Sequence, residues 1–291
     1  MVRIGHNDCV TQAVVDDLIR LLDLEQIERN IFRGQSPDER RQRVFGGQVA
    51  GQALVAAYRT VESGTAHSLH AYFLRPGDPT IPILYEVERI RDGRSFRTRR
   101  VVAIQHGQAI FHLSASFHEA ENGLEHQIPP PENIPAPETL PDFATRNAAL
   151  ADKLGDWYTQ PRPIDTRYVG PNPLAKAGET LDPEQYVWMR ADGELPDDPV
   201  LHQCVLTYAS DMSLLDTLTR PHGVSFVEGE VMMASLDHAM WFHRPFRADR
   251  WFLYAQDTPA ASGARGLARG LIYQDGQLVV SVVQEGLIRR L

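Results

Sequence analysis

Cysteine is almost absent from this chain of 291 residues, which contains only Cys9 and Cys204. Two cysteines cannot build a disulfide framework or a cysteine-based zinc site. Long apolar runs are also missing, so neither a membrane-spanning helix nor the apolar core of a signal peptide is present. The last residues, Arg-Arg-Leu, differ from the Ser-Lys-Leu peroxisomal address. We therefore expect a cytoplasmic protein that has no membrane partner.

Positive charge is scarce relative to negative charge. The chain has 29 Lys and Arg against 38 Asp and Glu, which gives a formal net charge of -9. A general nucleic-acid surface needs an excess of Lys and Arg to neutralise phosphates, so nucleic acid is excluded as a general partner. The hydrophobic content of 43% and the charged content of 23% are typical of a globular protein. The length leaves room for two domains, each with its own core.

The common catalytic signatures are missing as well. The sequence contains no Gly-x-Ser-x-Gly, no His-Glu-x-x-His, no Walker loop and no dinucleotide fingerprint. The histidine pairs His67 with His70 and His238 with His243 are three and five residues apart. On a strand such odd spacings direct the two side chains to opposite faces. We therefore expect no metal site and no cofactor.

An internal repeat is the main positive feature of the sequence. Residues 94–117 align without gaps to residues 263–286 at a constant offset of 169. The same offset relates Leu-Arg-Pro at residues 74–76 to His-Arg-Pro at residues 243–245, and each motif follows an aromatic strand pattern. Upstream, residues 45–48 resemble residues 208–211 at a smaller offset. A repeat of this size indicates a duplicated domain, in which each copy has a strand, a helix and several antiparallel strands.

Hydrophobic spacing predicts the elements of each copy. An amphipathic helix is expected over residues 11–24, a strand over 27–33, a polar loop over 37–41 and the first central helix after Phe45. The second central helix is expected to begin at a Ser210 cap and to carry Met212, Leu215 and Leu218. Strands are expected over residues 68–74, 83–91, 96–117 with a turn at His106 and Gly107, 164–169, 185–190, 236–243, 250–257 and 278–286. Residues 129–199 hold 13 of the 20 prolines and therefore indicate an irregular crossing between the copies.

Gln284 interrupts the pattern of the last of these strands. Leu278, Val280 and Val282 share one face of the strand with Gln284. The corresponding position of the first copy is Ala115, on an apolar face. A buried amide without partners is costly, so one interpretation is that Gln284 has a hydrogen-bonding task in the interior. The other interpretation is a strand-end glutamine that reaches solvent, and the pattern does not separate the two.

Two more polar residues stand out in the second copy. Asp211 is expected in the first turn of the second central helix, where unpaired backbone N–H groups stabilise a carboxylate. Ser235 corresponds to Ala66 of the first copy, and Asp211 to Gln48. Taken singly, Asp211 could be an ordinary helix-terminal acid and Ser235 a strand hydroxyl of no consequence. Together with Gln284 they indicate that the second copy keeps a site.

Three motifs resemble the acyl-CoA thioesterase II family. They are VFGGQVAGQA at residues 44–53, LDHAMWFHRP at residues 236–245 and VQEG at residues 283–286. The resemblance covers nearly the whole chain and implies an α+β double hot-dog fold, in which two curved antiparallel sheets join and each wraps around a central helix. It implies an N-terminal hot-dog domain over residues 1–120, a Pro-rich crossover linker over 121–184 and a C-terminal hot-dog domain over 185–291 with the catalytic residues.

The resemblance also implies a reaction, the hydrolysis of acyl-CoA in lipid metabolism. The family's water-orienting Asp, Thr or Ser, and Gln fall on Asp211, Ser235 and Gln284, and serine keeps the hydroxyl of the more common threonine. Homodimers or homotetramers are expected. The substrate contacts implied are oxyanion donors near Gly46 and Gly47 and an acyl slot with Met212, Leu215 and Phe242. CoA phosphates are expected near exposed arginines, and Arg94, Arg97, Arg99 and Arg100 form the densest basic cluster, although a run of charge on a strand is more often a solvated face.

Two rival functions remain open at this point. The hot-dog fold also supports enoyl-CoA hydration or acyl dehydration, which would require His238 beside Asp211. A non-catalytic acyl-CoA binding module would keep the slot, and its polar residues would be incidental.

Overall fold

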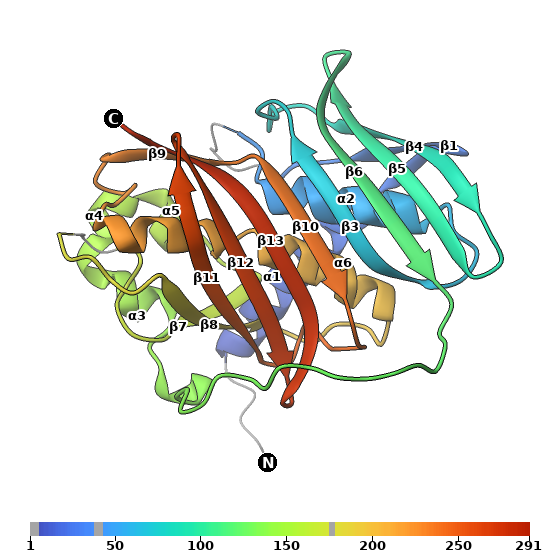
Figure 1. Ribbon diagram of the computed structural model, residues 1–291. Helices are drawn as coiled ribbons and strands as arrows, with labels where there is room; N and C mark the ends of the chain where they lie inside the picture. Colours follow the sequence, from blue (N-terminus) through green and yellow to red (C-terminus); the bar gives the residue numbers. More distant parts are fainter. Residues whose placement is uncertain (1–5, 38–42, 175–177) are drawn as a thin grey trace.

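One antiparallel sheet dominates the computed structural model, which describes residues 6–37, 43–174 and 178–291 (Figure 1). Within these residues the sheet has 13 strands, in the order β1-β2-β4-β5-β6-β3-β10-β13-β12-β11-β8-β7, and β9 pairs with β13. The helices α1, α2 and α6 lie behind the sheet in the view of Figure 1. Most of the polar loop expected at residues 37–41 lies outside the described residues.

The first half of the chain supplies one half of the sheet. Its elements are α1 (His6–Leu22), β1 (Glu25–Glu28), β2 (Ile31–Gly34), α2 (Gly46–Tyr58), β3 (Thr65–Phe73), β4 (Ile83–Asp92), β5 (Phe96–Gln105) and β6 (Gln108–His118). The single strand predicted over residues 27–33 was wrong, because a turn at Arg29 and Asn30 divides this stretch into the β1–β2 hairpin. Glu28 pairs with Ile31 beside that turn, so the chain reverses direction there.

The second half follows a crossover that runs along one edge of the sheet. The crossover contains η1 (Pro137–Thr139), α3 (Phe143–Asn147), η2 (Ala148–Leu150), α4 (Ala151–Leu154), α5 (Asp156–Thr159) and the edge strand β7 (Ile164–Tyr168). The elements after it are β8 (Glu184–Ala191), α6 (Pro199–Ser210), η3 (Leu214–His222), β9 (Val231–Ser235), β10 (Asp237–Phe242), β11 (Phe252–Ser262), β12 (Arg265–Gln274) and β13 (Gln277–Arg290).

The predicted repeat is present in the strand geometry. The hairpin of β5 and β6 and the hairpin of β12 and β13 begin at positions that differ by the offset read from the sequence. Both hairpins turn through two residues with positive φ, His106 and Gly107 in one, Asp275 and Gly276 in the other. Two residues of positive φ fit the twist of the flanking strands, so each pair closes a tight hairpin.

The two halves join into one sheet at the centre. Strand β3 pairs antiparallel with β10, and Leu69 lies opposite Met240. Behind this seam, α2 and α6 pack closely and antiparallel. A Cβ placed on Gly47 would lie 2.3 Å from the backbone oxygen of Tyr208, and one on Gly51 would lie 3.2 Å from that of Cys204. Glycine is required here because the two backbones nearly touch.

The position of the second central helix differs from the prediction. The helix α6 begins at Pro199, and its N-cap Asp198 accepts a hydrogen bond from Val200 N at 2.9 Å. It ends at Ser210, the residue expected to start it, and Asp211 is its C-cap. The spacing of Leu215 and Leu218 that looked α-helical belongs to the 3-10 helix η3. The start of α6 therefore corresponds to the start of α2, and Asp211 does not match Gln48.

Candidate active site

The carboxylate of Asp211 joins the three residues that the sequence singled out. Ser235 Oγ donates a hydrogen bond to Asp211 Oδ1 at 3.0 Å, and Gln284 Nε2 donates to the same oxygen at 2.7 Å. Asp211 comes from the end of α6, Ser235 from the last position of β9 and Gln284 from the middle of β13. Two donors on one oxygen fix the carboxylate, and its second oxygen, Oδ2, accepts no hydrogen bond from the described residues.

A break between β9 and β10 positions Ser235. Leu236 belongs to neither strand; its N–H donates to Glu285 O at 3.0 Å and its carbonyl accepts from Phe73 N at 3.0 Å. The side chain of Asp237 then accepts a hydrogen bond from Glu285 N at 2.6 Å. The first copy has only a register shift between Ala66 and Ser68 in the continuous strand β3. Because of this break, β9 pairs with β13, and Ser235 lies opposite Gly286.

The side chain of Gln284 lies in the interior, which is one of the two alternatives that the pattern left open. The residue is 0% exposed. Its Nε2 is held by Asp211, whereas its Oε1 has no hydrogen-bond partner within the described residues. The amide is thus oriented by its donor side.

The positive end of a helix lies beside Asp211, although it is not the helix that the sequence indicated. A Cβ placed on Gly46, the first residue of α2, would lie 2.6 Å from Asp211 Oδ2. The N-cap of α2 is Phe45, which offers no side-chain acceptor to the first backbone N–H groups. The partial positive charge of these N–H groups favours a carboxylate or an oxyanion. The helix end that can stabilise the Asp211 carboxylate is therefore the N-terminus of α2, which belongs to the other half of the chain.

A cleft of about 940 Å³ surrounds this point. Of the predicted substrate contacts, Gly46, Met212 and Leu215 line it, together with Asp211 and Ser235. Gly47 and Phe242 are not among its lining residues. Gly47 packs on α6, and Phe242 is 8% exposed and stacks on Phe246 with ring centroids 6.5 Å apart.

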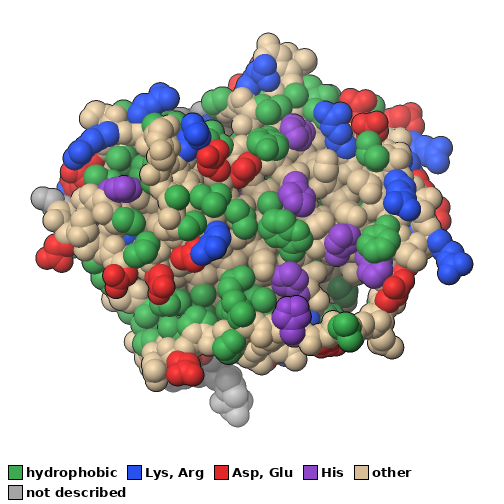
Figure 2. All heavy atoms as spheres, in the orientation of Figure 1, with side chains coloured by type: hydrophobic (Ala, Val, Ile, Leu, Met, Phe, Trp, Pro, Cys, Tyr) green, Lys and Arg blue, Asp and Glu red, His purple; other side chains and the backbone are tan. Residues whose placement is uncertain are grey.

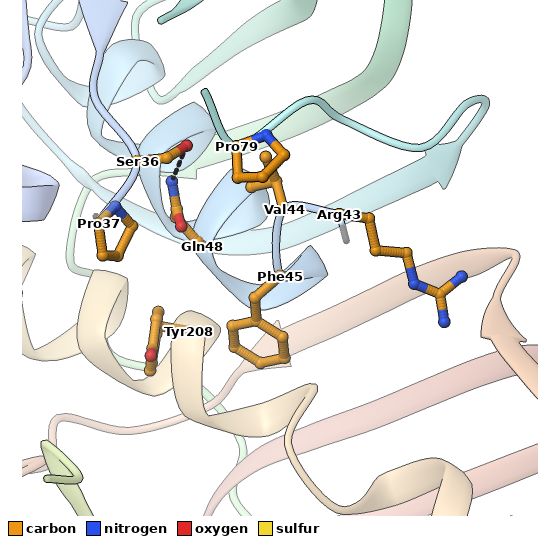
Figure 3. A pocket seen from close by; sticks show the side chains of 8 residues that line it. All are labelled: Ser36, Pro37, Arg43, Val44, Phe45, Gln48, Pro79 and Tyr208. Atoms are coloured by element: carbon orange, nitrogen blue, oxygen red, sulfur yellow. Dashed lines mark hydrogen bonds between the residues drawn. The ribbon is translucent and has the colours of Figure 1, made fainter. Parts of the chain in front are cut away.

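Several cleft residues were missed at the level of sequence. They include Trp157 of the crossover, Asp216 of η3, Phe226 of the loop after η3, Phe73 at the end of β3 and Ile110 of β6. Periodicity does not predict that these residues meet, because they come from distant segments of the chain. A smaller pocket of about 20 Å³ adjoins the cleft (Figure 3). There the ring of Phe45 meets that of Tyr208 edge-on, with centroids 5.1 Å apart.

The arginine cluster predicted to hold CoA phosphates has other tasks. Arg99 is only 1% exposed, and its guanidinium donates to Thr60 Oγ1 at 2.9 Å and to Asp92 Oδ1 at 2.5 Å. Arg97 pairs with Glu119 at 2.6 Å. Neither Arg94 nor Arg100 lines the cleft, where the guanidinium-bearing residues are Arg43 and Arg75. Of the two alternatives for this cluster, the phosphate site is not supported, because none of its four arginines lines the cleft.

His238 lies close to the site but has its own partner. It is 1% exposed, and its Nε2 is 2.8 Å from Ser210 Oγ. Burial lowers the pKa of His238, and the nearby Asp211 carboxylate and Gln284 amide oppose that shift. The imidazole is therefore neutral at pH 7. Asp211 takes its hydrogen bonds from Ser235 and Gln284, which is not the direct acid–histidine pair that hydration or dehydration would require.

Several histidines, among them His70 and His243, lie on the opposite face of the sheet. Figure 2 shows histidine side chains gathered near the centre of this outer face. His70 meets Trp241 across the seam with ring centroids 5.2 Å apart, and His243 Nε2 is 2.8 Å from Ser281 Oγ. In the part of the chain that the structure describes, no three His, Cys, Asp or Glu side chains gather as a metal site. None of the helices over these residues combines the length and apolarity needed to cross a membrane.

The fold defines a hot-dog protein, in which a continuous antiparallel sheet wraps two helices and a polar group of side chains lies at the wall of a large cleft. A hot-dog protein from Alicyclobacillus acidocaldarius has the same fold at 20% identity, with a TM-score of 0.75 over 95% of this chain and 98% of that one. Residues 164–287 match the acyl-CoA thioesterase family, and residues 36–118 match the acyl-CoA thioesterase N-terminal domain.

More similar relatives narrow the class to one family. Acyl-CoA thioesterase 2 of Haemophilus influenzae is 44% identical over 95% of this chain and 98% of its own length. The crystal structure of the acyl-CoA thioesterase II TesB2 from Mycobacterium marinum is 47% identical, with a TM-score of 0.77 over 93% of this chain and 97% of that one. The chain belongs to the acyl-CoA thioesterase II family and is a thioester hydrolase.

Proposed function

We propose that the chain hydrolyses acyl-CoA to a free acid and CoA with a water molecule that Asp211, Ser235 and Gln284 hold. The observation that supports this most is the pair of hydrogen bonds from Ser235 and Gln284 onto Asp211 Oδ1. Both donors leave Oδ2 to accept a proton. A carboxylate so fixed acts as a general base on water without having to reorient during the reaction.

The proton and bond changes balance within these groups. Asp211 takes one proton from the water, and the hydroxide oxygen attacks the thioester carbonyl carbon. The tetrahedral oxyanion needs donors, and the uncapped N–H groups in the first turn of α2, at Gly46 and Gly47, are suitable. Collapse of this intermediate breaks the carbon–sulfur bond, and the proton held by Asp211 passes to the leaving thiolate. General-base catalysis of this kind supplies about 10²- to 10⁴-fold in rate.

The cleft divides the substrate by its chemistry. Met212, Leu215 and Phe226 present apolar surface to an acyl chain. Arg43 and Arg75 line the cleft and are exposed, so they replace the earlier arginine cluster as partners of the CoA phosphates. The domain limits at residues 120 and 184, the assembly into dimers or tetramers and the cytoplasmic location stay predictions.

The test is release of free thiol from acyl-CoAs of increasing chain length by the wild type and by Asp211→Asn. Turnover by the wild type, lost in the variant while an unreactive thioether analogue still binds, supports the proposal. No thiol release by folded wild type would refute it. Absorbance of an enoyl-CoA in the same samples tests hydration, which would move the function to the rival class.

A further inference from the structure

A second carboxyl group lies in the wall of the cleft, and the hydrolysis proposed above does not use it. Asp216 lies in η3, five residues beyond Asp211, and lines the cleft. Its Oδ2 accepts a hydrogen bond from the hydroxyl of Tyr168 at 3.1 Å. Its Oδ1 has no hydrogen bond to any of the described residues. The crossover strand β7 supplies Tyr168, so two distant segments of the chain build this position.

Apolar side chains line the cleft together with Asp216. Leu215, Trp157 and Phe226 line the same cleft. Burial raises the pKa of Asp216 to about 7, and the hydrogen bond from Tyr168 opposes this rise. Near neutral pH the group is thus present in both protonation states, and it can donate or accept a hydrogen bond.

A plain alkyl chain does not complement this wall. Laid across Asp216, methylene groups would strip water from Oδ1 and offer no hydrogen bond in return. Leaving a buried polar atom without a partner costs at least about ten-fold in binding. A hydroxyl group on the acyl chain would instead donate a hydrogen bond to Oδ1 when Asp216 is ionised. When Asp216 is protonated, the same hydroxyl would accept a hydrogen bond from it.

We propose that Asp216 and Tyr168 form a polar subsite that selects acyl-CoAs whose chain carries a hydroxyl group away from the thioester. The subsite rests on the proposed hydrolysis only in that the acyl chain must enter this part of the cleft. Asp216 is a specificity-determining residue, because it lies apart from the hydrogen-bonded group of Asp211, Ser235 and Gln284. A subsite of this kind discriminates by hydrogen bonding, which separates substrates more sharply than an extra methylene does.

The experiment compares a saturated acyl-CoA with equally long chains that carry one hydroxyl at successive positions. For the wild type we expect one hydroxyl position to raise kcat/KM about ten-fold over the plain chain. Asp216→Leu should remove this preference and improve the plain chain, whereas Asp216→Asn should keep part of it. Equal kcat/KM for every chain with wild type would overturn the inference. So would an equal loss on plain and hydroxylated chains in Asp216→Asn, which would mark a catalytic role.

Binding separates this inference from the hydrolysis itself. The affinities of the same acyl-CoAs are measured by calorimetry with Asp211→Asn, which turns over slowly or not at all. Tighter binding of one hydroxylated chain, lost when Tyr168→Phe or Asp216→Leu is added, supports the subsite even where wild type releases no thiol. Equal affinities refute the subsite while leaving the proposed hydrolysis intact. Melting curves establish that each variant is folded. If Asp216→Leu is not folded, Tyr168→Phe takes its place in the test.

Discussion

The pair of antiparallel helices α2 and α6 has two ends, and only one of them carries the polar residues of the site. At one end α2 begins and α6 stops, and Asp211 meets Ser235 and Gln284. At the other end α6 begins and α2 stops, and the positions of Ser235 and Gln284 are taken by Ala66 and Ala115. The duplicated architecture offers two similar ends, which differ in these side chains and in the backbone break between β9 and β10.

Tyr58 fills the second end. Its hydroxyl accepts a hydrogen bond from Ala66 N at 2.7 Å and donates to the side chain of Gln203. Its ring meets Phe117 edge-on, with centroids 4.9 Å apart. Gln203 Nε2 in turn donates to Ala66 O at 3.1 Å. A hydrogen-bonded network of Tyr58, Gln203 and Ala66 therefore occupies this end, whereas the other end borders the cleft.

Removal of the acid should give the largest difference between the two ends. Asp211→Asn keeps the shape of the side chain but loses the base, so kcat should fall about 10²- to 10⁴-fold. Its matched control is Arg59→Lys, at the C-cap of α2 where Asp211 is the C-cap of α6. Thiol release should be normal in that control. An equal loss in both variants would contradict the assignment of the site to one end.

Replacing Ser235 or Gln284 with the alanine found at the same place in the first copy should have the next largest effect on kcat. Ser235→Ala and Gln284→Ala each remove one donor from Asp211 Oδ1, and each should lower kcat about 10- to 100-fold. Because the three residues act together, adding either change to Asp211→Asn should cost little more. Steady-state kinetics of the single and double variants measure this coupling. Additive losses would show that the residues act independently.

Crowding at the start of α2 should have a moderate effect. The methyl group of Gly46→Ala would lie 2.6 Å from Asp211 Oδ2 and 2.8 Å from Phe73 Cε1. We expect roughly a ten-fold loss of kcat as the carboxylate moves aside. Gly34→Ala is the control, because its methyl would crowd the side-chain oxygen of Gln52 at 2.7 Å, and neither residue lines the cleft. Unchanged kcat in Gly46→Ala would mean that the carboxylate position does not matter.

At the filled end the effect should be on stability. Tyr58→Phe leaves the buried Ala66 N–H without its acceptor, which should lower the free energy of unfolding by about 1–3 kcal/mol. Urea denaturation measures this loss, and thiol release by the folded variant should match that of wild type. A fall in kcat at full folding would show that the two ends are coupled.

The smallest predicted effect is a pH dependence at His238, whose counterpart in the first copy is Leu69. Burial lowers the pKa of His238 in the folded chain, so the unfolded chain binds the proton first as the pH falls. Wild type should therefore lose stability as the pH drops below about 6.5. His238→Leu lacks this loss, and its melting temperature relative to wild type should rise between pH 7 and pH 5. A constant difference would refute the shift.

Much of this comparison was available from the sequence, because alternation along a strand fixes which face a residue occupies. The offset of 169 located both hairpins and put Gln284 at the place of Ala115. Register thus carried information across the two copies. Local signals also existed for α6, since Asp198 and Pro199 are a typical N-cap and first helical residue. The apolar spacing of Leu215 and Leu218 pointed to a later helix instead.

The remainder depended on contacts between distant segments. No local pattern relates Gly46 to Asp211, since the approach of the two residues follows from the packing of α2 on α6. The break at Leu236 is not predicted by any local pattern either, because it depends on hydrogen bonds to both β3 and β13. Cleft residues such as Trp157 and Asp216 come from the crossover and η3, where periodicity carries no signal.

The seam between β3 and β10 gives the crossover a thermodynamic task. Those strands would be bare edges if either half stood alone, and an unpaired edge invites association with any other strand. The covalent connection converts their meeting from a second-order encounter into an intramolecular one, which does not depend on the protein concentration. Dilution therefore cannot separate Asp211 from the Gly46 end of α2, and the two stay together at any protein concentration.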